Sequence, residues 1–170
     1  VLKAAQSLKI KTAIHEQNAF PGVTTKMLAG NADTVMLAMP EAKRHLKLNK
    51  VPVITGNPIR QELLKTTREE ARAKLGLDND KPLLLSFGGS LGAEKINEAV
   101  AELIIWHNGT HKFHHIHATG KFGYENMKKA LEGTLLSDDI DIREYITDMD
   151  VCMAAADLVI CRAGAITLGE

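Results

Sequence analysis

The 170-residue sequence contains few aromatic residues, two cysteines and no long apolar run. A membrane-spanning helix needs about 20 predominantly apolar residues in a row, and no stretch of this sequence approaches that length. Cys152 and Cys161 lie in apolar surroundings, which favours buried reduced thiols, typical of a reducing cytosol, over a disulfide framework. Basic and acidic residues both number 21, so the formal net charge is zero. Without a basic run that interleaves with aromatic residues, nothing in the composition favours nucleic-acid binding.

Short apolar runs alternate with helical patterns along the whole sequence, and Gly, Asn or Pro stand at the joints. This alternation predicts an α/β fold in which parallel sheets are built through right-handed crossovers. The predicted strands are 12–15, 34–38, 51–55, 81–87, 113–118, 140–146 and 157–162, and the predicted helices include 21–30, 122–131, 148–155 and one that begins at Pro40. Residues 61–81 are charged and poor in β-branched side chains, so we expect them to join two α/β units.

Two sequence features predict helices after residue 66. Thr67 followed three residues later by Glu70 has the spacing of a capping box, which predicts a helix start. The helix that follows residue 93 is predicted from a single apolar stripe, made by Ile96, Val100, Leu103 and Ile104.

The most informative stretch is the apolar run 83–87, which leads directly into Gly88, Gly89, Ser90, Leu91 and Gly92. A buried strand, a glycine-rich turn and a helix start present free backbone N–H groups and the positive end of a helix dipole, which suit a phosphate or diphosphate. The stretch is not a P-loop, since the Gly-Lys-Ser/Thr ending is absent, and it is not a dinucleotide fingerprint. Ser90 is the natural polar contact, although the glycines could serve only close packing of strand and helix.

Residues 162–170 form a second predicted junction of strand, glycine and helix. Gly164 permits close backbone approach, and the backbone amides of 165–168 would be unpaired donors of a first helical turn. Glu170 would then lie about one turn into the helix, where its carboxylate could accept hydrogen bonds from the two hydroxyls of a ribose. The alternative is that Glu170 only complements the helix dipole.

Two further turns carry polar side chains beyond predicted strands, where ligands of parallel sheets bind. His15 and Glu16 could perform acid–base chemistry; equally, His15 could be a core residue and Asn18 a helix cap. Arg60 follows the rigid turn 56–58, so its guanidinium could clamp a phosphate or form a surface ion pair.

No metal site is predicted. Five of the seven histidines cluster at positions 107, 111, 114, 115 and 117. The cluster contains no Cys and no second ligand group at site spacing, and adjacent residues of a strand face opposite ways. The Asp pairs 139/141 and 148/150 fit a turn and a helix start better than a cation site.

Taken together, the segments 15–19, 56–60, 88–93 and 161–167 resemble the MurG family of bacterial glycosyltransferases, in the family's order and at similar spacing. The resemblance implies a GT-B architecture of two Rossmann-like domains. Residues 1–60 would be the later part of the acceptor-side domain, and 61–170 the first part of the domain that binds the UDP-sugar. Leu91 departs from the Gln of many members, and Ala163 and Gly169 replace a Ser seen in some.

By the same resemblance, the donor substrate UDP-N-acetylglucosamine would be contacted through a defined set of loops. Ile146 would use its backbone toward uracil, Ser90 would touch the diphosphate and Glu170 would hold the ribose. The full implied set is Asn18, Arg60, Ser90, Ile146, Ala165, Ile166, Thr167, Leu168, Gly169 and Glu170, with Gly88, Gly89 and Gly92 forming the phosphate loop.

The implied reaction is an inverting, metal-independent transfer of N-acetylglucosamine to the C4 hydroxyl of lipid I, which forms lipid II for peptidoglycan and so serves cell shape and division. No cofactor is implied, the partners are UDP-N-acetylglucosamine and lipid I, and no nucleic acid is expected. The full-length protein would be peripheral, on the cytoplasmic face of the bacterial plasma membrane and against its inner leaflet.

The resemblance also implies family segments outside residues 1–170: a glycine-rich loop with a nearby His before Val1, and a Gln that grips the sugar after Glu170. We therefore expect the catalytic residue in the N-terminal segment, and at most weak UDP binding without transfer by the 170 residues alone. The alternatives are a related UDP-sugar enzyme on the same architecture, such as a 2-epimerase or a glycolipid synthase, and a noncatalytic nucleotide-binding module. The string 15–18 argues against the related enzymes.

Overall fold

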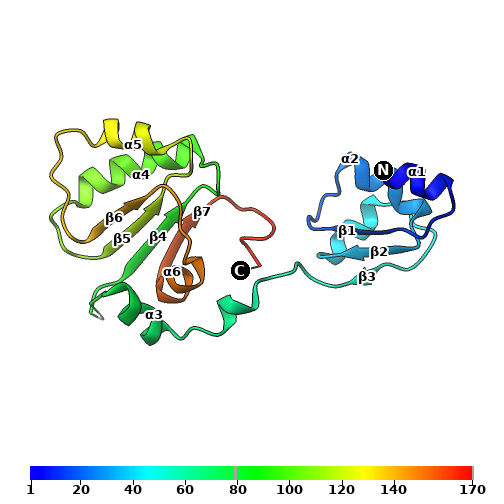
Figure 1. The fold of residues 1–170 in the computed structure, drawn as a ribbon, viewed down its shortest axis with the longest axis horizontal. Coiled ribbons are helices and arrows are strands. Elements are labelled where there is room, and N and C mark those ends of the chain that lie inside the picture. Colours follow the sequence, from blue (N-terminus) through cyan, green and yellow to red (C-terminus); the bar gives the residue numbers. More distant parts are fainter. Residues whose placement is uncertain (79, 170) are drawn as a thin grey trace. The chain divides into compact units, whose positions relative to one another are not determined.

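The computed structural model describes residues 1–78 and 80–169, which divide into two compact units (Figure 1). One unit is Val1–Ile59 together with Gly164–Glu170, and the other is Arg60–Ala163. We call them the smaller and the larger unit. The assignment of residues 1–60 and 61–170 to an acceptor-side and a donor-side domain stays a prediction.

The smaller unit is built around a short parallel sheet. Its elements are α1 (Leu2–Ser7), β1 (Ala13–Glu16), α2 (Val23–Leu28), a 3-10 turn (Ala29–Asn31), β2 (Thr34–Leu37), a 3-10 helix (Pro40–His45) and β3 (Val53–Ile54), with the strands in the order β1-β2-β3. The sheet buries a compact cluster of Ile14, Ala29, Ala32, Val35, Leu37 and Ala42. Alternate residues of β1 and β2 are buried, as expected for strands with one face against a core.

The larger unit holds a four-stranded parallel sheet in the order β6-β5-β4-β7. Its elements are a 3-10 helix (Gln61–Leu64), α3 (Arg68–Leu75), β4 (Leu83–Phe87), α4 (Glu94–His107), β5 (His114–Ala118), α5 (Tyr124–Ala130), β6 (Ile140–Arg143), α6 (Met149–Ala155) and β7 (Leu158–Cys161). Helices α3 and α6 lie over one face of the sheet, and α4 and α5 lie over the other (Figure 1). Every residue of β4 is therefore buried, which explains its continuous apolar run.

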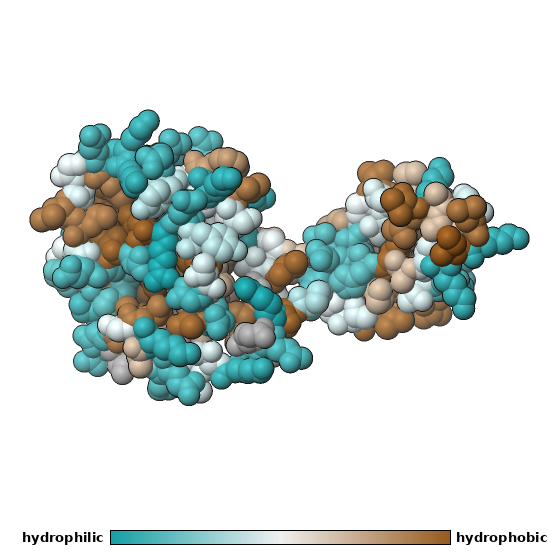
Figure 2. Space-filling view, viewed as in Figure 1, coloured by the Kyte–Doolittle hydropathy of each residue, from teal (hydrophilic) through white to brown (hydrophobic). Residues whose placement is uncertain are grey.

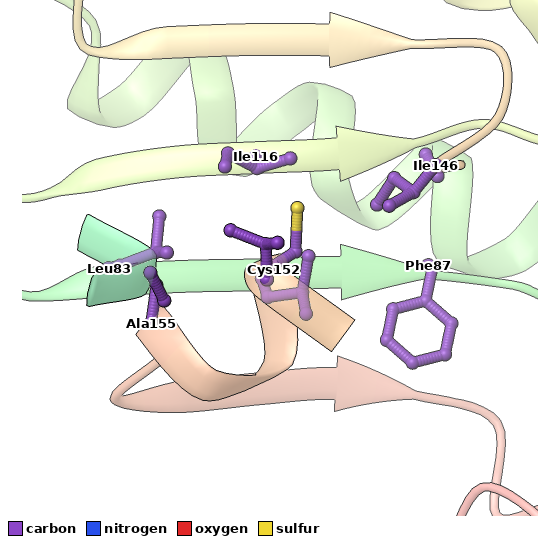
Figure 3. Close-up of a cluster of buried hydrophobic side chains, with 10 residues drawn as sticks. Leu83, Phe87, Ile116, Ile146, Cys152 and Ala155 are labelled. Atoms are coloured by element: carbon purple, nitrogen blue, oxygen red, sulfur yellow. The ribbon is translucent and has the colours of Figure 1, made fainter. Parts of the chain in front are cut away.

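The two faces of the larger sheet carry different side chains. On the α3/α6 side, Leu83 and Phe87 of β4 and Ile116 of β5 pack against Cys152 and Ala155 of α6 (Figure 3). On the α4/α5 side, Val100, Ala101 and Ile104 of α4 pack against Met127 of α5 and Leu131. The alternation along β4 and β5 follows from the two-residue period of a strand.

The predicted strands are all found, most of them with shorter ends, and so are the predicted helices other than the one expected from residue 165. Residues 165–169 form a turn. The helix predicted from Pro40 is a 3-10 helix, and the strand predicted over 140–146 ends at Arg143. The capping box is confirmed: the Thr67 hydroxyl accepts the Glu70 N–H, and the Glu70 carboxylate accepts the Thr67 N–H. Both cysteines are free, but only Cys152 is fully buried, so the expectation of two buried thiols holds for one.

No helix among the described residues is long and apolar enough to span a membrane. Apolar side chains do reach the surface: Figure 2 shows them gathered on the viewed face of the larger unit near the end of α4, where Ile105 and Trp106 are exposed.

Candidate functional site

The strand order of the larger unit marks one place on its sheet. The chain builds β4, β5 and β6 outward in one direction and then returns through α6 to place β7 on the other side of β4. Helix α4 connects β4 to β5 on one side of β4, whereas β7 lies on the other side, so the direction of strand addition changes between β4 and β7. Ligands of open parallel sheets bind beyond the carboxyl ends of the strands at such a topological switch point. The sequence predicted ligands at strand ends; the strand order singles out the pair β4 and β7.

The glycine-rich turn lies directly at this switch point. Gly89 and Gly92 both have positive φ angles, of +92° and +88°, and the Gly92 N–H donates to the Gly89 carbonyl at 2.9 Å. Ser90 is exposed at the tip of the turn. The helix α4 begins just after it, and no side chain caps the helix at Ala93. The first-turn N–H groups of α4 therefore lack the side-chain acceptor that a cap supplies.

The glycines of the turn have two different reasons to be glycine. A Cβ on Gly88 would collide with Ala93, and one on Gly92 would collide with the Thr119 carbonyl, so both serve close packing. A Cβ on Gly89 would meet no atom within 4 Å. Packing thus accounts for Gly88 and Gly92, as the simpler interpretation held, whereas Gly89 supplies only its backbone conformation and an open surface.

Residues 119–121 connect the glycine-rich turn to the segment before Ile146. The Lys121 N–H donates to the Ser90 carbonyl at 3.3 Å, and the Gly120 N–H donates to the Glu144 carbonyl at 2.9 Å. Ile146 itself is only 4% exposed and lies with Phe87 at the carboxyl end of the sheet (Figure 3). Its side chain therefore packs in the core and is not available to a ligand.

In the smaller unit, Asn18 is held in place by a buried carboxylate. Oε1 of Glu16 accepts from the Asn18 backbone N–H at 3.0 Å and from its side-chain amide at 3.1 Å, and Oε2 accepts from the Gly22 N–H at 3.3 Å. Burial acts to raise the pKa of Glu16, but these bonds and one from Thr25 outweigh it and hold the pKa below its usual value. Glu16 is therefore an ionised acceptor that orders the loop.

His15 is occupied in the same structural way. Its Nε2 lies 3.2 Å from the Thr55 hydroxyl and 3.1 Å from the Gly56 carbonyl, which ties the end of β1 to the end of β3. Since His15 and Glu16 bond to different loops, they do not form an acid–base pair. The contacts favour a structural role for this string, but not the one predicted: His15 is only half-buried, and Asn18 caps no helix, since α2 has Gly22 as its N-cap.

The predicted helix start at Ala165 is a hydrogen-bonded turn over residues 165–169. The Leu168 N–H donates to the Gly164 carbonyl at 3.0 Å, which is a single helical bond, and the Gly169 N–H donates to the Ile166 carbonyl at 2.8 Å. The Asn57 side chain donates to the Ala165 carbonyl at 2.9 Å. Glu170 lies outside the described residues.

The predicted site residues thus fall into both units. Ser90, Ile146 and the loop Gly88, Gly89 and Gly92 lie in the larger unit with the exposed Arg60, and Asn18 lies in the smaller unit with Ala165, Ile166, Thr167, Leu168 and Gly169. Among the described residues, no three His, Cys, Asp or Glu side chains group as metal ligands. The sequence interpretation missed Asn97, which contacts residue 119; its signal was a polar residue within an otherwise apolar helix stripe.

Three comparisons with known proteins bear on this site. Residues 83–170 match the family described as Glycosyltransferase family 28 C-terminal domain. The whole chain is 51% identical to a protein of Acetivibrio thermocellus named "UDP-N-acetylglucosamine--N-acetylmuramyl-(pentapeptide) pyrophosphoryl-undecaprenol N-acetylglucosamine transferase", and 45% identical to a protein of the same name from Caldanaerobacter subterraneus. The chain spans 46% and 47% of the length of these two relatives.

A solved structure gives the same result in three dimensions. The crystal structure of MurG from Acinetobacter baumannii superimposes with a TM-score of 0.65 at 30% identity, over 98% of this chain and 44% of that one. The resemblance stated from four sequence segments is confirmed. So is the predicted α/β architecture of GT-B type with parallel sheets.

Proposed function

Because this chain belongs to glycosyltransferase family 28, we propose that it supplies the donor-binding part of an inverting transferase. The reaction moves N-acetylglucosamine from UDP-N-acetylglucosamine to the C4 hydroxyl of lipid I and forms lipid II. The C4 hydroxyl attacks the anomeric carbon, and UDP departs with the bonding electrons. Since the chain spans about half of its relatives' length, the group that removes the hydroxyl proton is expected outside it.

One observation carries the proposal: the exposed glycine-rich turn at the uncapped start of α4, at the switch point between β4 and β7. Free N–H groups and the positive end of a 14-residue helix stabilise the negative charge that develops on a departing diphosphate. A bound divalent cation performs this task in other transferases. The turn therefore supports metal-independent chemistry by what it offers the phosphates.

The remaining contacts are proposed from the resemblance to the family. Ser90, whose hydroxyl is exposed, is assigned to the diphosphate, and the backbone of Ile146 is assigned to uracil. Arg60 contributes a positive charge, and Glu170 is assigned to the ribose hydroxyls. Asn18 and residues 165–169 are assigned to the rest of the donor. The acceptor is lipid I at the inner leaflet, so the whole protein would work peripherally at the cytoplasmic face of the membrane.

Calorimetric titration of the 170-residue chain with UDP, UDP-N-acetylglucosamine and ADP tests donor binding. We expect both uridine nucleotides to bind and ADP to bind at least tenfold more weakly, since uracil and adenine differ in their hydrogen-bonding edges. Equal binding of UDP and ADP would favour a module without nucleotide preference. Absence of UDP binding at millimolar concentration would refute donor binding by this chain.

A matched pair of glycine variants tests the turn itself. Gly89→Ala strains a positive φ at the turn, and Gly109→Ala strains a similar φ of +74° beyond the opposite end of α4; neither Cβ would meet an atom within 4 Å. The two variants should lose similar stability, but only Gly89→Ala should weaken UDP binding. Equal UDP affinity in both would remove the turn from the site.

Transfer is tested in a protein of the relatives' full length. The chain replaces its counterpart in the Acetivibrio thermocellus relative, to which it is 51% identical, and the chimera is assayed for label transfer from UDP-N-acetylglucosamine to a lipid I analogue. We expect activity within tenfold of the relative. Hydrolysis or epimerisation of the donor without transfer would favour a different UDP-sugar enzyme.

A further inference from the structure

A row of buried polar side chains runs between α4 and the sheet of the larger unit. The row consists of His107 and Asn97 on α4, Ser86 on β4, and His115 and His117 on β5. Ser86, His115 and His117 have no exposed surface, and Asn97 and His107 are also buried. Five polar side chains in a core carry a high cost unless each finds its hydrogen-bond partners.

Sequence spacing explains why these side chains meet. His115 and His117 are two residues apart on β5 and so share a face of the sheet, and Ser86 lies opposite His117 in the register of β4 and β5. Asn97 and His107 belong to the buried stripe of α4 that also contains Val100 and Ile104. The row thus connects one end of α4 to the other across the strands.

The donor and the acceptor of each hydrogen bond in the row can be assigned by starting from Asn97. The Asn97 side-chain N–H donates to the Thr119 carbonyl at 2.9 Å, so Oδ1 of Asn97 must be the atom that faces Nε2 of His117 at 3.2 Å. A flipped amide would set two oxygens against each other. Nε2 of His117 therefore donates to Asn97. Nδ1 of His117 lies 2.8 Å from the Ser86 hydroxyl and 3.1 Å from the Ser86 carbonyl, and in a neutral ring whose proton is on Nε2 it accepts from the hydroxyl.

The same accounting continues to the start of the row. The Ser86 hydroxyl donates its one hydrogen to His117, so its oxygen accepts from Nε2 of His115 at 2.8 Å. Nδ1 of His115 then accepts from Nε2 of His107 at 3.1 Å. All five bonds run one way, from His107 to the Thr119 carbonyl, and each polarises the next.

This direction requires neutral imidazoles, and the surroundings supply that condition. Burial lowers the pKa of His115 to about 3 and that of His117 to about 4, and it also lowers the pKa of His107. A protonated ring at any of the three positions would offer two donors and would break the sequence of donors and acceptors.

The row ends on the atom against which the glycine-rich turn is packed. A Cβ on Gly92 would collide with the Thr119 carbonyl, so turn and carbonyl are in direct backbone contact. Two residues further, the Lys121 N–H holds the Ser90 carbonyl at 3.3 Å. Residue 119 is therefore packed directly against Gly92 and lies two residues from the backbone hydrogen bond to Ser90.

We propose that Asn97 and His117 are positioning residues: they fix the Thr119 carbonyl and thereby hold the glycine-rich turn in the geometry that accepts a diphosphate. They touch no substrate atom and act through the turn. This inference rests on the proposed function for its ligand. The structural part of the inference, that the row controls the geometry of the turn, can be tested without any ligand.

The test compares two α4 variants in the full 170-residue chain. Asn97→Leu keeps the number and branching of the side-chain heavy atoms and removes both hydrogen bonds at the end of the row. Ile104→Ala leaves a cavity about two turns beyond Asn97 on the same buried stripe, and its side chain takes part in none of the hydrogen bonds of the row. Both variants destabilise the larger unit. A change in the glycine-rich turn that occurs in only one of them therefore reflects the hydrogen bonds that Asn97 makes and not a general loss of stability.

Two readouts are taken from each variant by amide NMR. In the ligand-free chain, we expect Asn97→Leu to shift the amide signals of residues 89–92 and 119–121, and Ile104→Ala to leave them in place. On titration, Asn97→Leu should weaken UDP binding about tenfold while uridine, which lacks phosphates, binds as before. His117→Phe, which keeps a ring and removes the bonds, should act like Asn97→Leu and guards against misfolding of one variant.

The outcomes separate the inference from the proposed function. Unshifted turn amides in both Asn97→Leu and His117→Phe, or equal shifts in Ile104→Ala, would overturn the positioning role. Loss of uridine and UDP binding in equal measure would also overturn it, because the effect would not pass through the phosphates. A wild-type chain that binds no UDP would refute the proposed function alone, and the ligand-free shifts would still decide the inference.

Discussion

The two units use the same parallel β/α construction but bury their sheets to different degrees. In the larger unit, helices cover both faces of the sheet, and β4 is buried along its whole length. In the smaller unit, the sheet has three short strands, and both residues of β3 are exposed. Among the largest fully buried side chains of the described residues, Leu37 alone comes from the smaller unit.

Exposed apolar side chains sharpen the contrast. Large apolar residues at the surface of the smaller unit are Val1, Leu2, Leu8, Ile10, Phe20, Val23, Met27, Val51, Val53, Ile54, Ile166 and Leu168. Each leaves apolar area in water that burial would have stabilised at roughly 25 cal/mol per Å². Stability within one chain is not uniform, and we infer that the smaller unit opens more readily than the larger unit.

The largest expected effect comes from deleting the same side chain in each unit. Leu85 and Leu37 are both fully buried, so Leu→Ala at either position should cost about 3 kcal/mol. We expect Leu85→Ala to leave the larger unit folded and Leu37→Ala to abolish slow hydrogen exchange in β1 and β2. Mass-spectrometric hydrogen exchange of both variants and the wild type checks this. Loss of protection in β4 before β2 would reverse the inferred order.

A second pair of variants tests how closely the backbones are packed. Gly92 has a positive φ, and a Cβ added there would collide with the backbone. A Cβ added to Gly30 in the smaller unit would lie 3.3 Å from the Lys47 carbonyl. Gly92→Ala should cost about 2–3 kcal/mol, and Gly30→Ala should change stability by less than about 0.5 kcal/mol. Urea unfolding followed by exchange measures each. A larger cost at Gly30 would mean that the smaller unit is the tightly packed one.

Much of this contrast was readable from the sequence, and the reason is local. The alternation of apolar runs and helical patterns predicted every strand, and the Thr67 capping box predicted the start of α3. The apolar run 83–87 predicted a strand covered on both faces, because such strands lack a polar alternation. The smaller unit shows the limit, since the helix predicted from Pro40 is a 3-10 helix.

The switch point and the row of buried polar side chains could not be predicted from the sequence, because both depend on contacts between distant segments. The switch point at β4 and β7 follows from strand order, which no local pattern encodes. The row from His107 to Thr119 depends on strand register; from sequence, the clustered histidines only raised a metal site, which was set aside. Asn97 in an apolar stripe was the available signal. Its meaning required the position of the Thr119 carbonyl.

Lowering the pH should reduce the difference in stability between the larger and the smaller unit. An unfolded histidine binds a proton below about pH 6.5, whereas folded His117 and His115 do so only near pH 4 and pH 3. The unfolded chain therefore binds more protons between these limits, and stability of the larger unit falls as the pH decreases, by about 1.4 kcal/mol per pH unit for each group.

The smaller unit should not respond in this range. Its shifted groups, Glu16 and Asp33, have a lowered pKa, so they lose their contribution only as the pH falls below their ordinary values near 4. Exchange at pH 7, 6 and 5 checks both units, and His117→Phe should reduce the slope of the larger unit by one group. A larger unit whose protection is constant from pH 7 to pH 5 would contradict this account.

The smallest expected effect lies at the start of α3 in the larger unit. Thr67 caps α3 through its side chain, whereas α1 and α2 of the smaller unit have no side-chain cap, and neither have α4, α5 and α6 of the larger unit. Thr67→Ala should lower the stability of the larger unit by about 1 kcal/mol, because one first-turn N–H loses its acceptor. Ser7→Ala, which removes an exposed hydroxyl bonded to the Lys3 carbonyl, is the matched control and should be neutral within about 0.5 kcal/mol. If the control costs as much as Thr67→Ala, hydroxyl hydrogen bonds in general, and not the cap of α3, account for the loss of stability.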